Sequence, residues 1–192
     1  MTTKAKGDSI RQKIIDLSKK LRVDHSSIET VFLIERLVAR LISNKTLAKN
    51  LVFKGGFVGL KIYESPRYTV DLDALLVKSN IESTLELVKE KAESDLNDGV
   101  WFRFESQVNP APQEAITQAL FQKNEEISWS VYPIETICAE KLHALISHGD
   151  LNSRSKDIHD LAIFLPKADG KTLKEAIKKV LFFVKLRCLQ VF

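Results

Sequence analysis

The chain has 192 residues, enough for one compact domain or for a catalytic core with a small helical extension. A hydrophobic share of 44%, a charged share of 28% and two cysteines exclude a low-complexity chain and a disulfide framework. The net charge of +4 is compatible with a phosphate-rich partner without requiring one. No signal-like segment opens the chain and no apolar run is long enough to cross a membrane, so we expect a cytoplasmic protein.

The first part of the chain predicts two helices followed by a short strand. Apolar residues recur at helical spacing over residues 8–22 and again over residues 27–43. Ser26 or Ser27 is the expected cap of the second helix, because a serine hydroxyl can accept a hydrogen bond from a first-turn N–H group. The apolar run at residues 51–54 predicts a strand.

The rest of the chain continues with strands among helices and ends in helices. Strands are expected at residues 69–77, 101–108 and 127–132, and helices at 80–95, 134–147, from about 156, and at 171–187, with 109–125 left open. This order predicts an α+β (or α/β) fold, with a mixed sheet flanked by helices. We expect a core with N-terminal helices at residues 1–132 and a helical C-terminal part at residues 133–192.

Asp71-Leu72-Asp73 is the most informative tripeptide. In a strand, residues two apart point to the same side, so both carboxylates would project together while Leu72 packs on the other face. Two such carboxylates repel each other unless a cation or a proton lies between them. Mg²⁺ suits the pair because it prefers oxygen ligands and shares its shell with substrate phosphates. Taken alone, the pair is more often ordinary strand surface, so its neighbours in the sequence decide.

A glycine pair lies upstream of these carboxylates. Lys54-Gly55-Gly56 falls between a strand and the start of an expected helical turn near Phe57, where glycine lets backbone N–H groups approach a phosphate closely. On its own the pair would be just a turn. Arg67, ahead of the next strand, could reach a phosphate or pair with the carboxylates, and a surface role is equally compatible with its position.

A charged cluster follows downstream. Lys141 stands in an apolar helical stretch, where it could lie along apolar surface or present a point charge to a triphosphate. Asp157 is near a helix start and could be a cap, and Asp160 could bond to backbone or pair with Lys156. The histidines do not show the spacing of a zinc site.

Three segments together resemble one family. Residues 51–60 with 67–73 resemble the first motif of the AbiEii-type nucleotidyltransferases, residues 132–142 resemble its lysine motif, and residues 154–161 resemble its closing Lys-Asp-x-x-Asp-Leu motif. The resemblance extends over about residues 28–165, and the three motifs in order are far more specific than any one of them.

The resemblance implies a polymerase β-like nucleotidyltransferase fold and a metal-dependent transfer of NMP from an NTP to an acceptor hydroxyl, on RNA such as tRNA. Asp71 and Asp73 would hold Mg²⁺ (or Mn²⁺). The nucleotide phosphates would be held by Lys54, Gly55, Gly56 and Arg67. Lys141 would contact the triphosphate, and Asp157 would be the later catalytic acid. Members often serve as toxins of toxin–antitoxin or phage-defence systems, which implies a cognate antitoxin.

The chain also departs from the family pattern. Phe57 stands where a small hydroxyl residue is common, so any phosphate contact from that side chain is lost. The region after residue 165 is short for the family. A catalytically weakened nucleotide- or RNA-binding module on the same fold is therefore the alternative.

Overall fold

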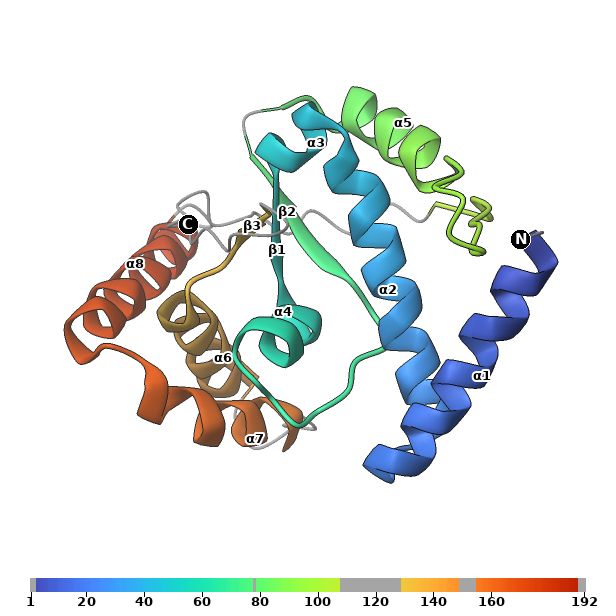
Figure 1. Ribbon diagram of the computed structural model, residues 1–192. Coiled ribbons are helices and arrows are strands. Elements are labelled where there is room, and N and C mark those ends of the chain that lie inside the picture. The colour runs from blue at the N-terminus through green and yellow to red at the C-terminus, as the bar shows by residue number, and fades with distance from the viewer. Residues whose placement is uncertain (1–2, 78, 108–128, 149–154, 190–192) are drawn as a thin grey trace.

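The computed structural model describes residues 3–77, 79–107, 129–148 and 155–189 (Figure 1). Its elements in chain order are α1 (Thr3–Leu21), α2 (His25–Ser43), α3 (Lys45–Asn50), β1 (Leu51–Lys54), α4 (Gly55–Ile62), β2 (Asp73–Leu76), α5 (Ile81–Ala92), β3 (Ser130–Val131), α6 (Ile134–His148), α7 (Ser155–Phe164), the short 3-10 helix η2 (Leu165–Lys167) and α8 (Gly170–Leu189). This is the expected α+β fold. Among the described residues no helix is both long and apolar enough to cross a membrane.

The described strands form one mixed sheet with the order β2-β1-β3. β1 runs antiparallel to β2, with Lys54 opposite Asp73, and parallel to β3, with Phe53 opposite Val131. β1 lies in the middle because its apolar residues can be covered on both faces. The register has a direct consequence: the end of β1, where the glycine pair follows, meets the first residue of β2.

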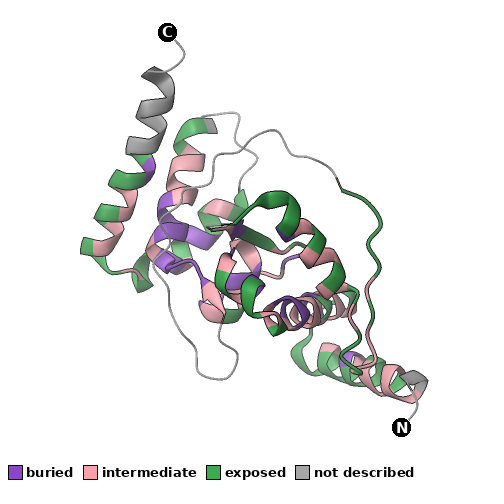
Figure 2. Ribbon diagram, turned by 90° about the horizontal axis from the view of Figure 1, so that it is seen from above, coloured by how far each residue is buried: buried purple, intermediate pink, exposed green. Residues whose placement is uncertain are grey.

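Helices cover this sheet and share one hydrophobic core with it. Buried residues of α2 recur at helical spacing, as in Val31, Ile34 and Val38, which explains why this segment forms a helix packed on the sheet. The same cluster contains Cys138 of α6 and Phe164 of α7. Cys138 is a free cysteine buried in this core. Figure 2 shows the buried residues gathered around the centre of the molecule.

A buried arginine ties the segment after α5 to α2. Arg40 is 0% exposed and donates to both carboxylate oxygens of Asp98, at 2.9 and 3.0 Å, and to the Ser94 carbonyl at 3.0 Å. Burial alone would raise the pKa of Asp98, but hydrogen bonds from Arg40, Val100 and Arg36 outweigh it and lower that pKa to about 2. This anchor was not predicted from the sequence.

Several expected elements have other boundaries in the structure. α2 is capped by Asp24, which accepts from the Ser27 N–H group at 3.1 Å, so the predicted serine caps are wrong. The strand expected at 69–77 covers only Asp73–Leu76, and the one expected at 127–132 only Ser130–Val131. Residues 109–125 lie outside the described part.

The strand expected at residues 101–108 is absent from its described part, residues 101–107. This segment is held by α5 instead of by a sheet. The Phe104 N–H group donates to Glu93 at 2.8 Å, and Lys89 lies 4.7 Å from the Phe104 ring centre. In the described part of the chain no strand pairs with it, so its alternating side chains form no ladder there.

Candidate active site

The turn between β1 and α4 needs glycine because other side chains already occupy the space beside it. Gly55 has a φ of 75°, and a Cβ atom there would overlap the carboxylate of Asp73. A Cβ atom on Gly56 would lie 2.8 Å from Thr69 Oγ1 and 3.3 Å from Arg67 Nη2. The glycine pair is thus packed against one of the candidate metal ligands and against the segment before β2.

The start of α4 is suited to bind an anion. Its N-cap residue is Lys54, and no side chain caps the first turn. First-turn N–H groups lack partners within their own helix, and the helix dipole favours negative charge at this end. The Lys54 ammonium donates to Glu140 Oε2 at 3.2 Å and lies 5.3 Å from the Tyr132 ring centre. A cation therefore lies next to the glycine turn.

Asp71 and Asp73 come together, although not as two residues of one strand. Asp73 is the first residue of β2, whereas Asp71 precedes the strand and accepts a hydrogen bond from Thr69 Oγ1. Leu72 is half-buried against the core, as expected. Burial and the charge of Asp71 raise the pKa of Asp73, while Lys54 and Lys141 act in the opposite direction. The carboxylates are therefore close enough to repel each other.

This pair fits a divalent metal that shares its ligands with a substrate. Among the described residues, no three His, Cys, Asp or Glu side chains gather into a metal-binding group. Mg²⁺ commonly uses one or two carboxylates and completes its shell with water and substrate phosphates. The two hard oxygen donors, their mutual repulsion and the adjacent anion-binding turn match that chemistry.

The C-terminal helices add a network of charges. Lys141 on α6 donates to Asp157 Oδ1 at 2.7 Å and lies 2.8 Å from Asp160 Oδ2, both on α7. Arg67 donates to Asp160 through two nitrogens, at 2.8 and 3.0 Å. Burial opposes ionisation of Asp160, which is 2% exposed, but the hydrogen bonds from Arg67 and Lys141 outweigh it and lower its pKa. Asp160 thus joins α6, α7 and the segment before β2.

The structure brings the sequence candidates into one place. Hydrogen bonds from Arg67 to Asp160 raise the pKa of Arg67, and the nearby charges of Asp157 and Asp71 act in the same direction. The charge of Lys141 acts to lower the pKa of Asp73, and the Lys141 ammonium also pairs with Asp157. The sequence left three roles open for Arg67: phosphate contact, pairing with Asp71 and Asp73, and a surface cation. In the structure Arg67 forms its ion pair with Asp160 instead.

Sequence reasoning missed the central role of Asp160. The suggested pairing of Asp160 with Lys156 gives way in the structure to Lys141 and Arg67. One signal was available: Asp160 lies on the same side of α7 as the buried Leu161 and Phe164, where a carboxylate needs a cationic partner.

Phe57, the departure from the family pattern, is buried, and its ring centre lies 5.8 Å from that of Trp129.

The family model described as "Nucleotidyl transferase AbiEii toxin, Type IV TA system" matches residues 36–115 and 100–186. The chain belongs to this family. It is therefore a nucleotidyltransferase of a toxin family, which confirms the resemblance carried by the three motifs. The matched residues include the glycine turn, the Asp71–Asp73 pair, Lys141 and Asp157, while α1 precedes them. No curated protein and no solved structure matches the chain.

Proposed function

We propose that this AbiEii-family enzyme transfers NMP from an NTP to a hydroxyl group of RNA, such as tRNA, with Mg²⁺ or Mn²⁺ held by Asp71 and Asp73. One observation carries the proposal: the Asp73 carboxylate lies directly against Gly55, at the uncapped start of α4. Carboxylates that can hold a metal and a turn that can hold phosphate are therefore neighbours.

In this transfer the acceptor oxygen bonds to the α-phosphorus, the bond between that phosphorus and the oxygen bridging to the β-phosphate breaks, and pyrophosphate leaves. The hydroxyl proton must pass to a base. When bound, the metal supplies positive charge that offsets the charge on the reacting phosphate oxygens. Gly55, Gly56 and the start of α4 hold the phosphates, with Lys54 and Arg67 nearby.

Lys141 can bind the triphosphate because a buried carboxylate holds its ammonium group in place. Asp160, buried and also bound by Arg67, holds the Lys141 ammonium from the interior. Asp157 is more accessible, with 16% of its side chain exposed. When a triphosphate takes a share of the Lys141 ammonium, the Asp157 carboxylate gives up part of this ion pair and can accept the acceptor's proton.

Membership in a type IV toxin–antitoxin family supports the wider biological proposal. We propose that the enzyme acts as a toxin in the cytoplasm, where NTPs and RNA are available, that a cognate antitoxin counteracts it, and that the pair contributes to phage defence.

The experiment uses the full chain with Mg²⁺, total tRNA and each α-labelled NTP in turn. Label should enter tRNA in wild-type reactions. Its incorporation should fall at least about 100-fold in Asp71→Asn and Asp73→Asn, because the metal that offsets the phosphate charge is then held more weakly. Glu175→Gln, an exposed carboxylate variant on α8, is the matched control and should keep wild-type activity.

Periodate oxidises the vicinal hydroxyls of the terminal ribose of tRNA, so a loss of labelling after this treatment assigns the acceptor hydroxyl to that ribose. Labelling that survives both the aspartate substitutions and the oxidation would contradict the proposal.

A further inference from the structure

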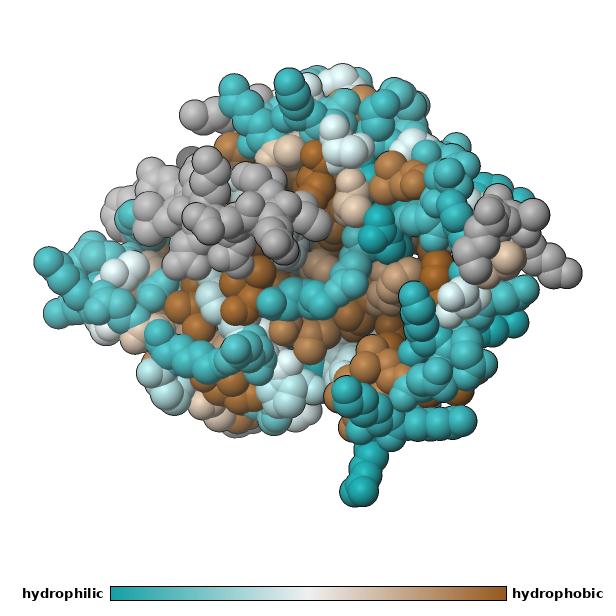
Figure 3. All heavy atoms as spheres, viewed as in Figure 1, coloured by the Kyte–Doolittle hydropathy of each residue, from teal (hydrophilic) through white to brown (hydrophobic). Residues whose placement is uncertain are grey.

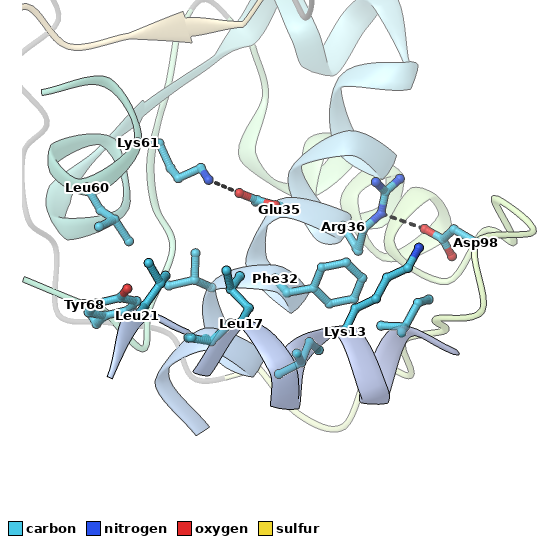
Figure 4. Close-up of a pocket in the computed structure, with 14 residues that line it drawn as sticks. Lys13, Leu17, Leu21, Phe32, Glu35, Arg36, Leu60, Lys61, Tyr68 and Asp98 are labelled. Atoms are coloured by element: carbon cyan, nitrogen blue, oxygen red, sulfur yellow. Dashed lines mark hydrogen bonds and ion pairs between the residues drawn. The ribbon is translucent and has the colours of Figure 1, made fainter. Parts of the chain in front are cut away.

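The segment formed by residues 67–69 contributes side chains both to the candidate active site and to a hollow beside it. Arg67 and Thr69 lie against Gly56 on the active-site side. Tyr68, between them, lines a hollow of about 640 Å³ formed by α1, α2 and α4 (Figure 4). Asp71 follows three residues later, so one short segment contributes both to this hollow and to the candidate metal site.

The hollow is apolar inside, with two aromatic side chains. Its lining includes Phe32 on α2, Tyr68, and Leu17 and Leu21 on α1. Figure 3 shows apolar side chains reaching the surface between α4 and the α1–α2 pair. Leu17 and Leu21, one helical turn apart on α1, remain 42% and 49% exposed, so the apolar lining of the hollow continues to the surface.

The acidic groups of the hollow are already paired. Glu35 forms an ion pair with Lys61, and Asp98 is held by Arg36 at 2.8 Å and by Arg40. Lys13, which also lines the hollow, has no acid partner among the described residues, and Lys20 is exposed and likewise shows none. Lys13 and Lys20 are two helical turns apart and therefore lie on the same side of α1.

Positive charge is concentrated in α1 and again in α8. Residues 1–22 contain seven basic and two acidic residues and residues 170–192 contain six and one, whereas residues 23–169 contain 16 basic and 22 acidic residues. α1 lies outside the residues that the family model matches. Its apolar residues Ile10, Ile14 and Leu17 line the hollow together with Lys13, so a cation lies at the edge of an apolar, recessed lining. A polyanion with planar bases fits a recessed lining better than a lipid surface, which requires an apolar stripe that projects outward.

We propose that this hollow binds a single-stranded stretch of RNA beside the reacting hydroxyl, with Lys13 and Lys20 against its phosphates and Tyr68 and Phe32 against its bases. Single strands are bound by cations that follow the backbone and by aromatic rings on which bases stack. The inference rests on the proposed transfer to RNA, because Tyr68 belongs to the segment that continues through Thr69 to Asp71.

Binding is measured on the full chain by fluorescence anisotropy, with a labelled single-stranded RNA 12-mer of mixed sequence and without NTP or metal. The Lys13→Glu/Lys20→Glu variant should lose about 10-fold or more in affinity, with a flatter dependence on salt. Lys171→Glu/Lys174→Glu on α8 changes the net charge by the same amount at exposed positions and should lose less than about 3-fold. Tyr68→Ala should lose about 10-fold, while Tyr68→Phe keeps its affinity, because the ring rather than the hydroxyl stacks.

Equal losses in the two lysine variants, or no loss in either, overturn the inference. Capture of the protein by anionic phosphatidylserine vesicles through Lys13 and Lys20, without RNA binding, also overturns it.

The Asp71→Asn variant should bind the 12-mer as the wild type does. RNA binding without NMP transfer would contradict the proposed function and leave the hollow as an RNA site, whereas transfer with unchanged acceptor KM in the lysine variant would contradict the hollow alone.

Discussion

The carboxylate of Asp73 occupies the space in which a side chain on Gly55 would begin. The β1–β2 register makes this contact unavoidable, because Lys54 pairs with Asp73 and the glycine follows immediately. A candidate metal ligand and a candidate phosphate-binding turn are thereby fixed next to each other by the sheet itself.

Gly55→Ala should abolish nucleotidyl transfer and lower stability by about 1–3 kcal/mol, because the new methyl group must displace Asp73 and φ is 75° at this position. The measurement pairs chemical denaturation with the tRNA-labelling assay. Gly170→Ala at the start of α8 is the control, since nothing lies within 4 Å of its added Cβ atom. A Gly55→Ala enzyme with wild-type activity would show that Asp73 need not stay where it is.

Asp160→Asn and Asp157→Asn should have different effects, although both remove a partner of Lys141. Asp160 is buried and also holds Arg67, so its variant should lose about 2–4 kcal/mol of stability and raise the KM for NTP as Lys141 loses its anchor. Asp157→Asn should stay nearly as stable as the wild type and lose mainly kcat. Denaturation together with steady-state kinetics separates the two, and identical profiles would refute the division of roles.

The Asp98 anchor predicts a dependence of stability on pH. Its folded pKa of about 2 lies below the ordinary value of 3.8, so the stabilisation is present above about pH 4 and is lost as the pH falls toward 2. Asp98→Asn should cost about 1–2 kcal/mol at pH 7 and nearly nothing at pH 2 relative to the wild type. Urea denaturation at several pH values measures this difference, and a difference that does not change with pH would contradict it.

Local patterns in the sequence predict much of this fold. The bounds of β1 follow from an apolar run that ends at a glycine pair, and α2 follows from its apolar stripe. The start of β2 was placed too early because residues 69–72 continue the alternating pattern. In the structure Thr69 is instead held against Gly56, before the ladder begins. Sequence periodicity cannot reveal such a contact, because the two residues meet only in the folded chain.

The candidate site was predictable as a set of segments but not as a network. Asp71, Asp73, Lys141 and Asp157 were identified from motifs in order along the chain. Asp160 and Arg67 are 93 residues apart, and Arg40 and Asp98 are 58 apart. No local sequence pattern links such partners, so the buried ion pairs of Asp160 and Arg40 could be identified only from the folded structure.

The central claim is that Asp71 and Asp73 support transfer of a nucleotide rather than of a terminal phosphate. Parallel reactions with α-labelled and γ-labelled NTP, each with Mg²⁺ or with EDTA, test this most directly. Label should reach tRNA only from the α position, only with Mg²⁺, and not in Asp71→Asn or Asp73→Asn. Label entering from the γ position, or α-label entering in EDTA or in both variants at the wild-type rate, would contradict the account.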